Sequence, residues 1–219
     1  MNTSDAPYDR EAVQVDSLPD SLTAGSTVLV ACTDDPSLYA VGLHILCQSG
    51  QADDTAFIVT TAEGISKTIE TYEHLCPDAE QPSLGVVDTS SKQQSVSAFY
   101  NETPAVFTPS PGDLERLVLA LGNLFENYPL STGAQHLLVR SLTPILDASS
   151  TDRVCTVMEQ IAGMRSETGL CLLGVDYTAH DEETITAIGK HVDGVLWATE
   201  SASNRLEFEY QPTKYRKHS

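Results

Sequence analysis

One short segment of the chain has the spacing of a phosphate-binding loop. The apolar run that ends at Ala31 is followed by an eight-residue turn and then by a helical pattern from Ala40. This order matches the motif G-x-x-x-x-G-K-[ST], in which backbone amides and a lysine hold phosphates and a hydroxyl group holds Mg²⁺. The eight residues are Cys32, Thr33, Asp34, Asp35, Pro36, Ser37, Leu38 and Tyr39.

The side chains at the positions that contact nucleotide differ from that motif. Cys32 and Ser37 replace the two glycines, whose lack of a side chain lets the backbone wrap a phosphate. Leu38 stands at the position of the lysine, and Tyr39 stands at the position of the hydroxyl residue that holds Mg²⁺. The spacing of the motif is therefore present without its phosphate ligands.

The same turn carries two acidic residues, Asp34 and Asp35. They place negative charge where a phosphate would bind, and two unit charges about 4 Å apart repel by roughly 4 kcal/mol at an effective dielectric constant near 20. We therefore expect no tight binding of a triphosphate in the usual manner. Taken alone, the segment fits an ordinary strand–helix turn better, with Asp34 or Asp35 capping the helix and Pro36 as its first residue.

A second turn, after the apolar run Leu170–Val175, holds Asp176, His180 and Asp181. An imidazole beside two carboxylates could act in base catalysis or bind a metal. We expect a structural role instead, because Asp181 or a neighbour can cap the following helix and the acidic residues after it suit the helix dipole. We predict no catalytic residue and no metal ligand in the chain.

Strand-like and helix-like patterns alternate along the sequence. Several of the expected strands are continuously apolar, as in parallel strands that are covered on both faces. They are Thr27–Cys32, Ala56–Thr60, Leu84–Asp88, Ala105–Thr108, His136–Val139, Leu170–Val175 and Gly194–Ala198. Helical spacing of apolar residues predicts helices between them, at Pro36–Gln48, Gly64–His74, Asp113–Tyr128, Asp152–Arg165 and Asp181–His191.

These elements predict an α/β fold with a mostly parallel central sheet and helices on both faces. The strictly alternating stretch Arg205–Tyr210 predicts a C-terminal antiparallel hairpin that closes the sheet. We divide the chain into a flexible acidic lead-in (1–24), one domain (25–212) and a basic tail (213–219).

The acidic composition limits the kinds of partner. Acidic residues number 31 against 12 basic ones, for a formal net charge of −19. Such a charge repels nucleic acids and anionic membranes. Because the acids are spread along the chain instead of forming a run, we interpret them as an adaptation to concentrated salt more than as a surface for a basic partner. The sequence has no span of about 18 apolar residues and no signal peptide, so we expect a cytoplasmic protein.

The five cysteines, Cys32, Cys47, Cys76, Cys155 and Cys171, form no C-x-x-C pair. Most of them lie in apolar or periodic segments, where a free cysteine acts as a small hydrophobic residue. We therefore predict neither a zinc site nor a disulfide framework.

Several segments, in order, resemble the RecA/KaiC-like proteins that are common in haloarchaea. The resemblance covers roughly residues 20–212 and implies a RecA-like P-loop NTPase core. The segments that carry it are GSTVLV at 25–30, LGVVD at 84–88, SPGDL at 110–114, RSLTPIL at 140–146, AHDEET at 179–184 and VDGV at 192–195.

By this resemblance, the chain also lacks two further residues that the family uses in catalysis. The family has two adjacent glutamates after its second strand, which position or activate the attacking water, whereas this chain has Ala62 and Glu63. The family ends its Walker B strand with Asp-Ser, whose aspartate supports Mg²⁺, whereas this chain has Arg140 and Ser141. An arginine cannot ligate a metal.

Together these losses remove most of the machinery for phosphoryl transfer. The resemblance implies that the Walker A and Walker B strands are neighbours in the sheet, so we expect that Arg140 could pair with Asp34 or Asp35. We expect a vestigial nucleotide site, no cofactor, and a non-catalytic regulatory or scaffold protein acting through protein contacts, with homo-oligomers left open. The resemblance to RecA/KaiC-like proteins implies a role in signalling, motility or gene regulation. The alternatives are an ATP-binding or ATP-hydrolysing enzyme with unconventional phosphate ligands and, less favoured by the charge, a nucleic-acid module.

Overall fold

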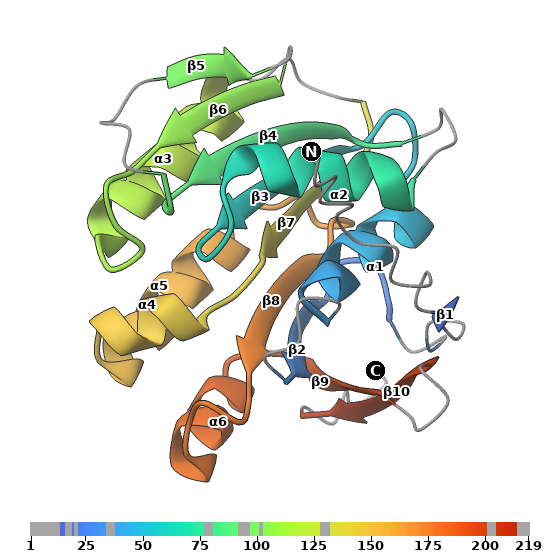
Figure 1. Cartoon of the computed structure of the whole chain (residues 1–219), viewed down its shortest axis with the longest axis vertical. Helices are drawn as coiled ribbons and strands as arrows, with labels where there is room; N and C mark the ends of the chain where they lie inside the picture. Colours follow the sequence, from blue (N-terminus) through green and yellow to red (C-terminus); the bar gives the residue numbers. More distant parts are fainter. Residues whose placement is uncertain are drawn as a thin grey trace, which may run out of the picture.

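In the part of the chain that the structure describes, ten strands form one sheet. Helices cover both of its faces (Figure 1). The computed structural model describes residues 14–15, 19, 22–33, 38–76, 81–91, 97–100, 103–127, 132–200 and 205–213. The strands are β1 (Gln14–Val15), β2 (Thr27–Cys32), β3 (Thr55–Thr60), β4 (Ser83–Asp88), β5 (Ser97–Tyr100), β6 (Thr103–Phe107), β7 (Gln135–Val139), β8 (Cys171–Asp176), β9 (Gly194–Glu200) and β10 (Arg205–Pro212).

The helices connect the strands and cover the sheet. They are α1 (Val41–Ser49), preceded by a short 3-10 turn at Leu38–Ala40, α2 (Ile65–Leu75), α3 (Leu114–Asn127), α4 (Thr143–Ala148), α5 (Thr151–Ala162) and α6 (Glu182–Gly189). Helices α1 and α2 pack with alternate strand residues in one apolar core. Helices α3, α4, α5 and α6 pack against the opposite face in a second core.

The strand order is β1-β10-β9-β2-β8-β7-β3-β4-β6-β5. From β9 through β2, β8, β7, β3 and β4 to β6 the neighbours are parallel, and antiparallel pairs occur at β9–β10 and β5–β6. The predicted fold class is therefore confirmed, including the C-terminal antiparallel hairpin. Because the central strands run in one direction, their carboxyl ends meet along one edge, where α/β proteins commonly bind ligands.

The elements differ from the prediction in a few places. Helix α1 begins at Val41 instead of Pro36, and the short helix α4 and the edge strand β5 were not predicted. Strand β1, inside the predicted lead-in, pairs in parallel with β10. The domain boundaries at 24 and 212 stay a prediction. Within the described part of the chain, no helix is long and apolar enough to span a membrane.

The prediction that the chain lacks disulfides is wrong for one pair. Cys47, in the last turn of α1, and Cys76, just after α2, form a disulfide with their Cα atoms 5.9 Å apart. The pair is separated by 29 residues in the sequence, and packing of α1 beside α2 brings the two thiols together. Cys32, Cys155 and Cys171 are buried.

Candidate functional site

Arg140 is the central residue of the candidate site. It follows β7 directly, and its side chain is only 5% exposed. Its guanidinium forms an ion pair with Glu63, with Nη2 2.9 Å from Oε2. Its Nη1 donates a hydrogen bond of 2.8 Å to Thr68 Oγ1, whereas its Nε is buried and finds no hydrogen-bond partner among the described residues. The buried cation of Arg140 is thus held by a carboxylate and a hydroxyl.

The backbone around Arg140 is fixed by the neighbouring strands. The Arg140 N–H donates to the Val59 carbonyl of β3 at 3.0 Å, and the Leu142 N–H donates to the Gly174 carbonyl of β8 at 2.7 Å. A Cβ atom at Gly174 would overlap the Arg140 carbonyl, so a glycine at this position lets β8 approach the end of β7. The direction of the Arg140 side chain toward α2 therefore follows from the sheet.

The connection between β3 and α2 supplies the other half of the site. Glu63 lies in this connection with its side chain 35% exposed, and Thr68 lies in the first turns of α2. The Thr61 hydroxyl donates to the Ser141 carbonyl at 2.7 Å, which ties this connection to the segment after β7. Both Thr61 and Ser141 are buried. The structure thus brings together Glu63, Arg140 and Ser141, three of the predicted site residues.

Asp88, at the end of β4, holds the N-terminus of α2. The N-cap residue of α2, Gly64, offers no side chain, and the Asp88 carboxylate accepts the Ile65 N–H at 3.0 Å. The same carboxylate accepts the backbone N–H and hydroxyl groups of Ser90 and Ser91, at 2.6–3.0 Å. Burial pushes the pKa of Asp88 upward, but these hydrogen bonds outweigh burial and hold the pKa below its ordinary value.

Asp88 was expected only as the last residue of the strand Leu84–Asp88, with no role in a site. Its position at the carboxyl end of a parallel strand was a usable signal, because such ends meet the N-termini of the helices that follow neighbouring strands. The missing cap at Gly64 was a second signal, since the orphan amides of a helix N-terminus need an acceptor. Asp88 therefore belongs to the site as the residue that positions α2.

The phosphate-loop-like segment is described only in part. Cys32 ends β2 and is buried, with its Sγ 3.5 Å from the Val175 carbonyl of β8. Thr33 is half-buried, and Asp34, Asp35, Pro36 and Ser37 lie outside the described residues. Leu38 and Tyr39 lie in the 3-10 turn. The N-cap residue of α1, Ala40, provides no side-chain cap, and the expected capping by Asp34 or Asp35 stays a prediction.

The expected pairing of Arg140 with Asp34 or Asp35 rests on a wrong premise. Strand β8 lies between β2 and β7, so these two strands are not neighbours in the sheet. Both aspartates lie outside the described residues. The guanidinium finds its partners instead on the opposite side of β7, where β3 is the neighbour and Glu63 and Thr68 follow it.

The turn after β8 has the structural role that was expected. Asp181 is the N-cap of α6, and its carboxylate accepts the Thr184 N–H at 2.8 Å. The Asp176 carboxylate accepts the N–H and the hydroxyl of Thr178, at 2.9 and 2.6 Å. Among the described residues, no three His, Cys, Asp or Glu side chains are arranged to hold a metal ion.

Comparison with known proteins relates the chain to one family. Residues 25–197 match the family of unknown function DUF7504. A search of curated proteins finds no significant match.

The fold is also shared with solved archaeal structures from Pyrococcus horikoshii. The uncharacterized protein PH0321, solved in complex with an unknown peptide, is 13% identical, with a TM-score of 0.58 over 90% of this chain and 86% of that one. The KaiC-like protein PH0186 is 12% identical, with a TM-score of 0.55 over 89% and 81% of the two chains. The protein PH0250 is 12% identical, with a TM-score of 0.54 over 89% of this chain and 90% of that one. At these identities the similarity concerns the fold.

Proposed function

The chain belongs to the family of unknown function DUF7504, and from that premise we propose that it is a non-catalytic, pseudo-ATPase member of the RecA/KaiC-like fold. It acts through protein–protein contacts in regulation or signalling. The fold is that of a KaiC-like protein, whereas the residues expected to hold phosphate and magnesium are replaced.

One observation carries this proposal: the Arg140–Glu63 ion pair of 2.9 Å. By resemblance, the position of Arg140 would hold the aspartate that supports Mg²⁺, and Glu63 would orient the attacking water. The ion pair occupies Glu63 with a buried cation, and a cation at this point repels Mg²⁺. With Leu38 in place of the lysine, the segment expected to hold phosphate lacks one of the positive charges that stabilise phosphoryl transfer.

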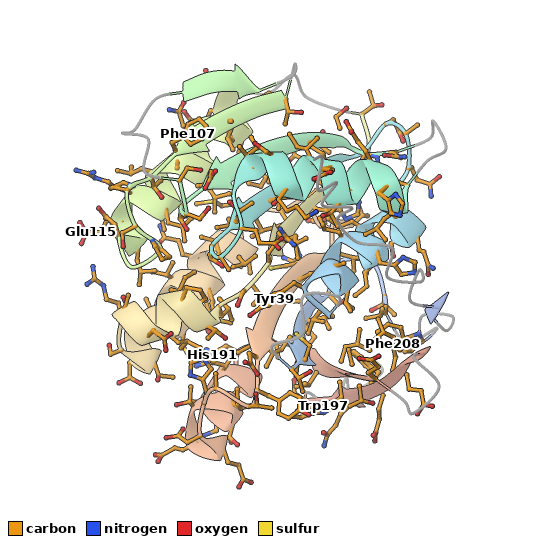
Figure 2. The ribbon with its side chains drawn as sticks, in the orientation of Figure 1. Tyr39, Phe107, Glu115, His191, Trp197 and Phe208 are labelled. Carbon is orange, nitrogen blue, oxygen red and sulfur yellow. A yellow bond between two sulfur atoms is a disulfide. The ribbon has the colours of Figure 1, made fainter. Side chains whose placement is uncertain are left out.

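A surface suited to protein contact lies between α3 and α5. Leu119 of α3 is 72% exposed, and the groove beside it is lined by Leu114, Glu115, Val118, Arg153, Thr156, Val157 and Gln160. Glu115, 84% exposed, points outward from α3 (Figure 2) and pairs with Arg153 at 3.2 Å. An apolar centre with a charged rim is typical of protein interfaces.

We further propose that the acidic surface is an adaptation to concentrated salt of the haloarchaeal type. Carboxylates that repel each other at low ionic strength are screened as salt rises. The melting temperature should therefore rise steeply from dilute buffer to molar KCl. A melting temperature that is highest in dilute buffer contradicts this part of the proposal.

Calorimetric titration with Mg-ATP in high salt tests the non-catalytic assignment. We expect no binding at micromolar concentrations of nucleotide. Micromolar, Mg²⁺-dependent binding would favour the alternative, an ATP-binding protein with unconventional phosphate ligands. The proposed protein–protein contacts are tested by capturing partners of the wild-type protein from native high-salt lysate. The Leu119→Glu variant is the matched control. A partner retained equally by both proteins contradicts a role for the α3–α5 surface.

A further inference from the structure

The disulfide between Cys47 and Cys76 joins the two helices that cover one face of the sheet. Cys47 lies near the C-terminal end of α1, and Cys76 is the C-cap residue of α2. Figure 1 shows α1 and α2 side by side on this face. The Cα–Cα distance of 5.9 Å is within the range from which two cysteines can be bridged without moving the backbone. Both the linked and the unlinked state therefore fit the same backbone.

Small thiols have access to one side of this bond. Cys47 is half-buried, whereas Cys76 is only 8% exposed. Exchange begins when a thiolate reaches a sulfur atom, so Cys47, the less buried residue of the pair, is the expected point of attack. The other three cysteines are buried and are correspondingly shielded.

Helix α2 links this bond to the candidate site. Its C-terminal end carries Cys76, and its N-terminal end is held by Asp88 and carries Thr68, the partner of Arg140. Tyr72, between the two ends, is buried in the core that α2 shares with α1. A change in how firmly α2 is held at Cys76 therefore acts on the same helix that positions the partners of Arg140.

We propose that Cys47 and Cys76 form a reversible thiol–disulfide switch that sets how firmly α2 is held against α1. In the reducing direction, the thiolate of a small thiol attacks Cys47 Sγ, and the bond to Cys76 breaks with Cys76 leaving as a thiolate. A second small thiolate then attacks the sulfur of the bound thiol, which releases Cys47 as a thiolate and forms the small-molecule disulfide.

The exchange is balanced. Two electrons pass from the two small thiols to the protein, and each protein thiolate takes up a proton released by a small thiol. A small-molecule disulfide drives the reverse reaction. The linked state restricts the unfolded chain, because it closes a loop between residues 47 and 76. The switch does not depend on whether the protein binds nucleotide.

The experiment compares the full-length protein equilibrated with oxidised or with reduced glutathione. Alkylation followed by mass spectrometry should show Cys47 and Cys76 protected in the oxidised sample and modified in the reduced one. The melting temperature should fall on reduction by about 7–14 °C, from the entropy of a loop of this length and the usual stability slope for a chain of this size. Amide exchange should quicken more in α2 than in α3, because the bond acts on α2 directly and on α3 only through the stability of the whole fold.

Two variants decide the outcome. The double variant Cys47→Ser with Cys76→Ser should show one melting temperature under both conditions, and Cys155→Ala, a change in the opposite core, should keep the full shift. Alkylation of both cysteines in the oxidised sample would overturn the proposal. So would a glutathione-dependent shift that survives in the double variant, or a reduced protein with the melting temperature and α2 exchange of the oxidised one.

Discussion

The guanidinium of Arg140 lies 2.9 Å from the carboxylate of Glu63, with the arginine side chain 5% exposed and the glutamate side chain 35% exposed. Because the two side chains are buried to different degrees, the loss of one partner costs a different amount of stability from the loss of the other. A glutamate that loses its partner can turn toward water, whereas a buried arginine that loses its partner stays in the protein interior as an uncompensated charge.

We therefore expect Glu63→Ala to reduce the free energy of unfolding by about 2–3 kcal/mol, below the usual loss for a fully buried pair because Glu63 is partly exposed. The measurement is denaturant unfolding at neutral pH in high salt. Glu70→Ala is the matched control, because the carboxylate of Glu70 is 73% exposed in a surface pair with Lys67. Equal stability of the Glu63→Ala variant and the wild type would show that the ion pair contributes nothing.

The coupling between the two residues is a separate prediction. The double variant Arg140→Met with Glu63→Ala should be more stable than the sum of the two single losses implies, by about 1–3 kcal/mol, because removing both partners leaves no buried charge. A double-mutant cycle in denaturant measures this energy. Strict additivity of the two losses would mean that the residues do not interact.

Asp88→Asn should destabilise the protein at neutral pH by about 2–3 kcal/mol, since a buried carboxylate that accepts five hydrogen bonds is replaced by an amide with one oxygen. The pKa of Asp88 is lowered in the folded protein. Its contribution is therefore fully present above the unfolded pKa of about 3.9 and is lost as the pH falls through the folded pKa.

The stability gap between wild type and Asp88→Asn should thus be constant from neutral pH to about 5 and should narrow in more acidic solution. Urea unfolding across this range measures the gap. Asp113→Asn, at a partly exposed helix start, serves as the control. A gap that widens toward acid pH would contradict the direction of the pKa shift.

The buried pair of His136 and Asp54 lies at the amino ends of β7 and β3, away from the candidate site, and stabilises the fold. His136 Nδ1 accepts the Leu170 N–H at 3.0 Å, so Nε2 carries the proton and donates to Asp54 at 3.1 Å. Burial raises the pKa of Asp54, but hydrogen bonds from Gln51, His136 and Ala134 outweigh it, and the pKa is lowered overall. We expect His136→Phe to cost about 2–4 kcal/mol, because it leaves the Leu170 amide and the Asp54 carboxylate without this partner.

Thermal unfolding of His136→Phe measures that loss, with His74→Phe as the control on the exposed side of α2. A variant as stable as the wild type would show that water replaces the imidazole at no cost. The contribution of Asp54 follows the same sign as that of Asp88: it is present above the unfolded pKa and is lost as the pH falls through the lowered folded pKa.

The fold was predictable because its signals are local. Continuous apolar runs such as Thr27–Cys32 and Leu170–Val175 mark buried parallel strands, and both form strands in one sheet. The helix cap at Asp181 was predictable for the same reason, since its acceptor and donor are three residues apart.

The site was less predictable because its contacts depend on strand order. Arg140 meets Glu63 because β3 is the neighbour of β7, and no pattern near Arg140 encodes that strand order. The cap that Asp88 provides to α2 and the bridge between Cys47 and Cys76 also join segments far apart in the sequence. Such pairings follow from packing, and packing is settled only when the whole sheet is assembled.

Release of phosphate from Mg-ATP in high salt, compared between the wild type and Glu63→Gln, tests the central claim most directly. If the ion pair with Arg140 has replaced the catalytic arrangement, both proteins should release phosphate at the rate of buffer alone. Steady release by the wild type that Glu63→Gln abolishes would show that Glu63 still serves a catalytic reaction, and it would contradict the account.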